Sequence, residues 1–158
     1  MYLVRIFLMM MVSVAAAQAK TEPAGWTENY ELAKQRARAT GKPILALFTG
    51  TDWCPPCKQF DEQVAHSEQF LRYAADKMVL LKLEFPKHML QSPALYAQNS
   101  ALAERIPGVE FPRFYLLNAE GEVLTKINMR VRRPARNLNE LYTLAIEDGL
   151  AAVPKAKD

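Results

Sequence analysis

The sequence predicts an α/β fold, in which a mixed central sheet of about four strands is flanked by helices. Two short apolar runs, residues 44–49 and 79–85, are separated by helical patterning, so we expect them to be parallel neighbours. Two further runs, residues 113–118 and 123–128, are joined by the turn sequence Ala119-Glu120-Gly121-Glu122, which is typical of an antiparallel hairpin. The 158 residues suit one domain with a single core.

The first 19 residues differ in kind from the rest of the chain. Arg5 precedes an apolar run over residues 6–17, and Ala17-Gln18-Ala19 fits a signal-peptidase cleavage site, with Ala15-Ala16-Ala17 as an alternative. The run is shorter than the about 20 residues of a membrane span, and no nearby cysteine could carry a lipoprotein anchor. We therefore expect a cleaved secretory signal over residues 1–19 rather than an uncleaved anchor. The mature domain would cover residues 20–150 and a flexible tail residues 151–158.

The charge pattern excludes some classes of partner. The net charge of +3 falls to 3 − 1 = +2 when the signal is removed with its single arginine. Acidic and basic residues are mixed, so the composition favours neither nucleic-acid nor membrane-surface binding. One basic cluster, defined as Arg130, Arg132, Arg133 and Arg136, is compatible with a solvated loop or with a surface for an acidic partner. No dimerisation segment is evident, so we expect a monomer.

The first half of the mature chain is predicted to form a helix, a strand and two further helices. A helix is expected over residues 27–40, capped by Thr27 and ended by Gly41. The apolar run over residues 44–49 is short, which favours a buried strand. After a loop, Pro55 suits the first turn of a helix that ends near Ala65. Ser67 then caps a helix to Asp76. The expected core residues of these helices are Trp26, Tyr30, Ala33, Ala37, Phe60 and Val64.

The second half adds a strand, a helix, the hairpin and a last helix. Pro86 ends the strand over residues 79–85, and Ser92-Pro93 opens a helix that ends near Arg105. Asn137, with Glu140 three positions later, resembles a capping box for a helix to about Asp148. Its expected core residues are Leu138, Leu141 and Ala145.

The two cysteines, Cys54 and Cys57, are the only ones in the chain. Cys54 lies where a buried strand meets a helix start, and there free N–H groups and the helix dipole favour a thiolate and a lowered pKa. The thiolate is the form that attacks a disulfide, and Cys57 is close enough to resolve the product. Pro55 and Pro56 carry no N–H, and they stiffen the turn between the two cysteines.

Other uses of a Cys-x-x-Cys pair fit less well. A c-type haem needs His after the second cysteine, where this chain has Lys58. Zinc needs two more ligands, for which only His66 and His88 are available. A purely structural disulfide would close too small a loop to stabilise much. We therefore predict that the cysteine pair carries out redox chemistry without a metal or other cofactor.

Residues 50–58, Gly-Thr-Asp-Trp-Cys-Pro-Pro-Cys-Lys, resemble the active site of the thioredoxin superfamily. The chain is more closely similar to exported bacterial thioredoxin-like proteins in its Lys-Pro-Ile-Leu strand at residues 42–45, its Phe85-Pro86 and its Phe111-Pro112. The Trp-Cys-Pro-Pro-Cys motif is also similar to that of tryparedoxins and nucleoredoxins. The resemblance implies a thioredoxin-like fold over residues 26–148 and a periplasmic location.

The same resemblance implies roles for further residues. The Phe111–Pro112 bond should be cis and face the cysteines, so that Phe111 can pair with an extended substrate and Trp53 can line the groove. An ordinary proline at a strand start is the alternative. Two positions depart from the family pattern. Phe48 replaces a buried Asp six residues before the first cysteine, and Arg113 replaces the Thr after the cis proline.

Four residues are candidates for tuning the pKa of the thiols. Lys82 or Glu84 could replace the missing Asp, although both could instead lie at the solvent end of their strand. Arg113 could favour the thiolate or be a solvated strand residue, and Lys58 directly follows Cys57.

The sequence thus predicts an exported thiol–disulfide oxidoreductase that acts on protein thiols and disulfides with a redox partner protein. The alternative is a redox-inert module or chaperone that binds peptides in the same groove.

Overall fold

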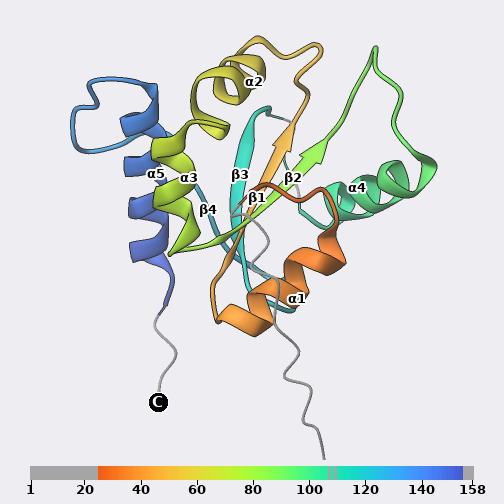
Figure 1. Cartoon of the computed structure of the whole chain (residues 1–158), viewed down its shortest axis with the longest axis horizontal. Helices are drawn as coiled ribbons and strands as arrows, with labels where there is room; N and C mark the ends of the chain where they lie inside the picture. Colours follow the sequence, from red (N-terminus) through yellow and green to blue (C-terminus); the bar gives the residue numbers. More distant parts are fainter. Residues whose placement is uncertain (1–24, 107, 109, 155–158) are drawn as a thin grey trace, which may run out of the picture.

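The computed structural model describes residues 25–106, 108 and 110–154. It confirms the predicted α/β fold, with helices on both faces of one four-stranded sheet (Figure 1). The predicted signal peptide, residues 1–19, lies outside the described residues, as do residues 155–158 of the predicted tail. None of the helices within the described ranges is long and apolar enough to cross a membrane.

The strands pair as the sequence predicts. Their order across the sheet is β2-β1-β3-β4, where β1 and β2 are parallel and β3 is antiparallel to both β1 and β4. The carboxyl ends of β1 and β2 and the amino end of β3 therefore lie at one edge of the sheet. The strands are β1 (Ile44–Thr49), β2 (Val79–Glu84), β3 (Arg113–Leu117) and β4 (Val123–Lys126).

The helices begin largely where the capping signals place them. Ser67, Ser92 and Asn137 each accept a hydrogen bond from a first-turn N–H, as predicted. The predicted helix over residues 55–65 is an α-helix followed by a π-helical segment. The helical segments are α1 (Tyr30–Thr40), α2 (Pro55–Phe60), η1 (Asp61–Ala65), α3 (Glu68–Ala75), α4 (Pro93–Arg105) and α5 (Leu138–Ala152).

Two details of the helix prediction are wrong. Asn29 rather than Thr27 caps α1, because the backbone of Thr27 bonds to β2 through Leu80 and Lys82 at 3.0 and 2.9 Å. Helix α5 continues past Asp148 to Ala152, so the first part of the predicted tail is helical.

Two apolar clusters hold the layers together, one on each face of the sheet. Leu45 and Leu47 of β1 pack toward α2, η1, α3 and α5, whereas Ile44, Ala46 and Phe48 pack toward α1 and α4. Figure 1 shows these two sets of helices on opposite sides of the sheet. Every residue of β1 is buried, because the strand lies between two neighbours and is covered on both faces.

Phe60 lies at the centre of the first cluster. Its ring is 4.5 Å from that of Tyr142, 5.0 Å from that of Phe114 and 5.9 Å from that of Phe70. On α5 the buried residues are Tyr142, Ala145, Ile146 and Gly149. Ala145 is as predicted, but Leu141 is only half-buried and Leu138 lies at the margin of the cluster.

We expect Phe60→Ala to lower the free energy of unfolding by about 3–5 kcal/mol, because it removes the ring that joins α2, α3, β3 and α5. Urea denaturation followed by circular dichroism measures this loss. Tyr96→Ala removes an aromatic ring that is 66% exposed, so it should change the same quantity by less than about 0.5 kcal/mol. Equal effects of the two variants would contradict the assignment of the core.

Candidate functional site

The two cysteines lie at the junction of β1 and α2. The chain leaves β1 through Gly50, whose carbonyl accepts the N–H groups of Trp53 at 3.2 Å and Cys54 at 2.8 Å. Cys54 is the extended N-cap residue of α2, and Pro55 occupies the first turn. The indole ring of Trp53 lies directly over Gly50, where any side chain would collide with it. The turn thus requires glycine at this position and fixes Cys54 at the helix start.

Cys54 and Cys57 form a disulfide, with their Cα atoms 5.2 Å apart. Cys57 is fully buried, whereas Cys54 is 5% exposed. Cys54 is therefore the less buried residue of the pair. The pair stands at the start of a helical segment that continues through η1, as the sequence predicts.

An aromatic wall stands beside the disulfide. The Phe111–Pro112 bond is cis, as predicted. Phe48 of β1 lies opposite Arg113 of β3, so Pro112 is at the same sheet edge as the turn that follows β1. The rings of Trp53 and Phe111 are 5.4 Å apart, and the Trp53 indole N–H donates to the Phe85 carbonyl at 2.7 Å.

Asp52 fastens a second loop to the cysteine turn. Its carboxylate accepts the backbone N–H groups of Lys87, His88 and Met89 at 2.6–3.2 Å. Desolvation opposes ionisation of this carboxyl, but the hydrogen bonds outweigh it and hold its pKa below the usual range. The Lys87 ammonium also lies 3.8 Å from the centre of the Trp53 ring. Neither residue was predicted from the sequence, although an Asp before Trp-Cys is a signal for such an anchor.

Lys82 and Glu84 are not at the solvent end of β2. Glu84 is 7% exposed and accepts the Thr51 N–H at 2.6 Å. Lys82 lies 2.9 Å from Asp61 and 3.4 Å from the second oxygen of Glu84, which accepts no hydrogen bond within the described residues. Partial burial opposes the charge of Lys82, but the hydrogen bond and the two carboxylates raise its pKa. Asp61, which the sequence analysis missed, stands one helical turn after Cys57, and its N–H donates to the Cys57 carbonyl.

Position 48 is not a place from which an acid could serve Cys57. Phe48 belongs to the cluster on the α1 and α4 face, whereas Leu47 points into the cluster that contains Phe60 of α2. The expectation that Phe48 takes the place of a catalytic Asp is therefore wrong. On the cysteine side of the sheet, Lys82 and Glu84 are the charged residues of β2.

Arg113 is not solvated either, because it is only 4% exposed. Its guanidinium lies 4.4 Å from the centre of the Phe48 ring and donates to the Gly108 carbonyl. Burial lowers the pKa of this group. Lys58, by contrast, is exposed on α2, where its ammonium lies 3.8 Å from Glu62. The structure thus joins Lys82 and Glu84 in one network and leaves Arg113 and Lys58 in separate surroundings.

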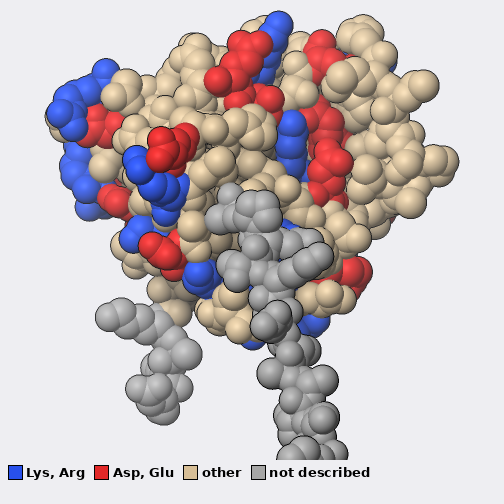
Figure 2. All heavy atoms as spheres, viewed as in Figure 1, with Lys and Arg blue, Asp and Glu red and all other residues tan. Residues whose placement is uncertain are grey.

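The basic cluster before α5 is partly neutralised. Arg133 lies 3.1 Å from Glu147 and 3.4 Å from Asp148, and Arg136 lies 3.1 Å from Glu140. Figure 2 shows acidic groups among the basic ones at this edge of the molecule. Within the described part of the chain, no acidic partner is found for Arg130 or Arg132.

Comparison with known proteins finds a family and several relatives that this chain resembles. A family model described as thioredoxin-like matches residues 25–119. The thioredoxin-related protein DsbJ of Chlamydia pneumoniae is 28% identical over 133 residues, which are 84% of this chain and 38% of that protein. The disulfide bond reductase DsbH of the same organism is 28% identical over 100 residues, which are 63% of this chain and 60% of that protein.

A solved structure has a similar fold. The structure of a DsbH oxidoreductase matches with a TM-score of 0.67 and 23% identity, over 86% of this chain and 92% of that one. The chain spans only about two fifths and three fifths of the length of the two curated relatives. The likeness to tryparedoxins and nucleoredoxins stays a prediction from one short motif.

We expect Lys82→Met to lower the free energy of unfolding at pH 7 by about 1–3 kcal/mol, because it leaves two carboxylates without their cation. The pKa of Lys82 is raised in the folded state above its unfolded value of about 10.4. Its contribution to stability is therefore complete below that pH, and it is lost as the pH rises through the folded pKa. The difference between wild type and variant should thus be constant to about pH 10 and shrink above it. Urea titrations over this range measure it.

Lys58→Met is the matched control, because it removes an exposed ammonium that faces Glu62 on the same helix. Exposed pairs of this kind contribute little, at most about 0.5 kcal/mol. If Lys82→Met were no worse than this control, the three charges would not form a stabilising network.

Proposed function

Since the chain belongs to the thioredoxin-like family, we propose that it is a thiol–disulfide oxidoreductase that exchanges disulfides with protein substrates through Cys54 and Cys57. The observation that carries the proposal is the disulfide at the start of α2, in which Cys54 is 5% exposed and Cys57 is fully buried. This arrangement provides a first thiol that meets the substrate and a second that ends the reaction.

In the reducing direction both cysteines begin as thiols. The Cys54 thiolate attacks one sulfur of a substrate disulfide, and the other substrate sulfur leaves as a thiolate that takes up a proton. The Cys57 thiol then loses its proton and attacks Cys54, which re-forms the Cys54–Cys57 bond and releases the second substrate thiol. The substrate gains two electrons and the pair loses two. A partner dithiol restores the reduced pair, and oxidation of a substrate runs through the same steps in reverse.

The surroundings support this assignment of roles. No side chain caps α2 at Cys54, so the positive end of the helix dipole is free to favour a thiolate there. Pro55 and Pro56 have no N–H to offer it. Cys57 is fully buried, and Asp61, one helical turn after it, is joined through Lys82 to Glu84. We assign the uptake of the Cys57 proton to this network.

Trp53, Phe111 and Pro112 form the docking surface in this proposal. A cis proline leaves the backbone of the preceding residue open to an extended segment, which is the strand-addition mode of peptide recognition. The flat ring of Trp53 is held from two sides, by Phe85 and by Lys87. The surface is thus rigid before a substrate arrives, which lowers the entropic cost of docking.

The setting of this activity is also part of the proposal. The pattern of residues 1–19 supports export, and a disulfide persists outside the cytosol. The chain would act in the periplasm as a monomer, without a bound cofactor, and would exchange electrons with another protein. Its direction depends on its reduction potential, for which about −270 mV marks a reductant and about −120 mV an oxidant.

The reduction of insulin by dithiothreitol tests the proposal. Wild-type protein should accelerate the onset of turbidity, and Cys54→Ser should abolish the acceleration, because the attacking sulfur is lost. Lys58→Met should keep at least half of the rate. If wild-type protein and Cys54→Ser both behave as blanks, the redox-inert peptide-binding module or chaperone becomes the better account.

The order of the two sulfurs is tested by alkylation and trapping. In the reduced protein at pH 6, iodoacetamide should modify Cys54 at least about tenfold faster than glutathione, whereas Cys57 should be protected by burial. Mass spectrometry identifies the modified residue. A Cys57→Ser variant should accumulate mixed disulfides through Cys54 that Cys54→Ser does not form. Preferential labelling of Cys57 would reverse the assignment.

A further inference from the structure

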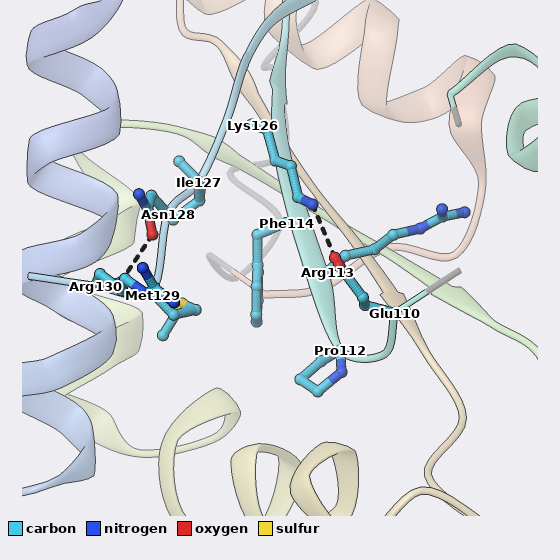
Figure 3. A pocket seen from close by; sticks show the side chains of 9 residues that line it. All are labelled: Glu110, Pro112, Arg113, Phe114, Lys126, Ile127, Asn128, Met129 and Arg130. Carbon is cyan, nitrogen blue, oxygen red and sulfur yellow. Dashed lines mark hydrogen bonds and ion pairs between the residues drawn. The ribbon is translucent and has the colours of Figure 1, made fainter. Parts of the chain in front are cut away.

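A hollow of about 560 Å³ opens beside the cis proline, between β3 and the loop that precedes α5. Its floor is apolar and includes Pro112, Phe114 and Ile127, and its wall includes Met129 and Arg130. Figure 3 shows Pro112 at one end of the hollow and Asn128, Met129 and Arg130 along one side. The volume suits several side chains of a peptide, because ligand pockets span about 300–1,000 Å³.

The edge of β3 is open where it meets the hollow. Strand β4 accompanies β3 only as far as Phe114, whose carbonyl accepts the Ile127 N–H at 2.9 Å. The chain then turns away at Asn128, whose side chain accepts the Arg130 N–H at 2.9 Å. Before Phe114, β3 has only Arg113, which pairs with Phe48 of β1, and β4 does not reach it, so the start of β3 and Pro112 border the hollow on this side. An extended segment that docks at Pro112 can continue into this space.

Two cations that line the hollow, Arg113 and Arg130, have no acidic partner among the described residues, and only Arg130 is exposed. The Lys126 ammonium lies 2.8 Å from Glu110, and this hydrogen bond holds the pKa of Glu110 below its usual range. Arg113 also borders the hollow, but its guanidinium is stacked on Phe48 and points away in Figure 3. Among the described residues, Arg130 has no acidic partner. An acidic side chain in the hollow would meet a cation that nothing else neutralises.

We propose that this hollow is a specificity subsite for an acidic side chain, Asp or Glu, in the segment of a protein substrate that flanks its reactive cysteine. The inference rests on the proposed function, because it names a feature of the substrate that the same docking surface selects. Arg130 supplies the charge, and the apolar floor takes the aliphatic part of the acidic side chain. Arg130 is a specificity-determining residue and takes no part in bond exchange.

The test uses capped peptides with one cysteine, activated as mixed disulfides with 2-nitro-5-thiobenzoate. Attack by the Cys54 thiolate releases the coloured thiolate and joins the peptide to Cys54, and Cys57 then frees the peptide as a thiol. Glu, Gln or Lys is placed in turn at each of three positions on either side of the cysteine. Stopped-flow absorbance with the reduced full-length mature protein at low ionic strength gives the second-order rate constants.

At one or more positions, wild-type protein should react about tenfold faster with the Glu peptide than with the Lys peptide. Attraction of the Glu side chain by Arg130 should raise the rate constant about threefold, and repulsion of the Lys side chain should lower it about threefold. Arg130→Gln should reduce the ratio to about twofold or less. Arg132→Gln makes the same change in net charge two residues away, outside the hollow, and should keep the wild-type ratio. Salt at 0.5 M should shrink the wild-type ratio.

Two outcomes would overturn the subsite: no position discriminates Glu from Lys, or the two arginine variants lose discrimination equally. A binding arm separates these from failure of the redox proposal. Labelled Glu and Lys peptides without the activating group are titrated against a Cys54→Ala/Cys57→Ala variant by fluorescence polarisation. If wild-type protein exchanges with no peptide, the proposed function fails. The subsite then stands if the Glu peptide binds more tightly, and it falls if the two peptides bind equally.

Discussion

The complete burial of β1 is the constraint on which the rest of the structure depends. A strand with neighbours on both edges and helices on both faces has no room for a charged side chain. Chemistry therefore has to begin where the strand ends. Gly50 allows the chain to turn there, and Cys54 is the first residue that both touches the core and starts a helix. The pairing of β1 with β2 and β3 brings Glu84 and Pro112 to that same edge.

The edge is held by a small number of strong contacts between segments that are distant in sequence. Asp52 binds three successive N–H groups of the loop after β2, and Trp53 binds the Phe85 carbonyl of the same loop. Lys82 lies between Asp61, which follows Cys57 by one helical turn, and Glu84, so that two acids and one base share a partly buried space. A charge in such a place keeps its influence because water screens it poorly. The turn that carries Cys54 is thus held by the loop after β2, through Asp52 and Trp53, and by Glu84, which accepts the Thr51 N–H.

Local patterns were enough to predict most of the fold. The strands, their parallel and antiparallel pairing, three helix caps and the cis bond all agree with the structure, because each depends on a short run of residues or on the family resemblance. The errors concern residues whose role is set by distant partners. Thr27 looked like a cap but pairs with β2, and Leu141 fitted the helical period, yet Tyr142 fills the core. Phe48 was compared with a family Asp by counting six residues back from Cys54. Side chains alternate between the two faces of a strand, and Phe48 faces α1 and α4 instead of α2.

The basic cluster shows why composition alone says little about partners. Four arginines within seven positions suggest a positive patch, and the sequence offers no way to choose among them. The structure divides them by what they meet. Arg133 and Arg136 face acids of α5, which fold back beside them, so their charges are balanced within the chain. A balanced ion pair attracts a substrate weakly, because its field falls off faster with distance than that of a single charge. The charge of Arg130 is not balanced by an acid of the described residues, and Arg130 lines the hollow that also includes Pro112. Selection by charge is therefore a property of one position, and the net charge of the chain neither reveals nor predicts it.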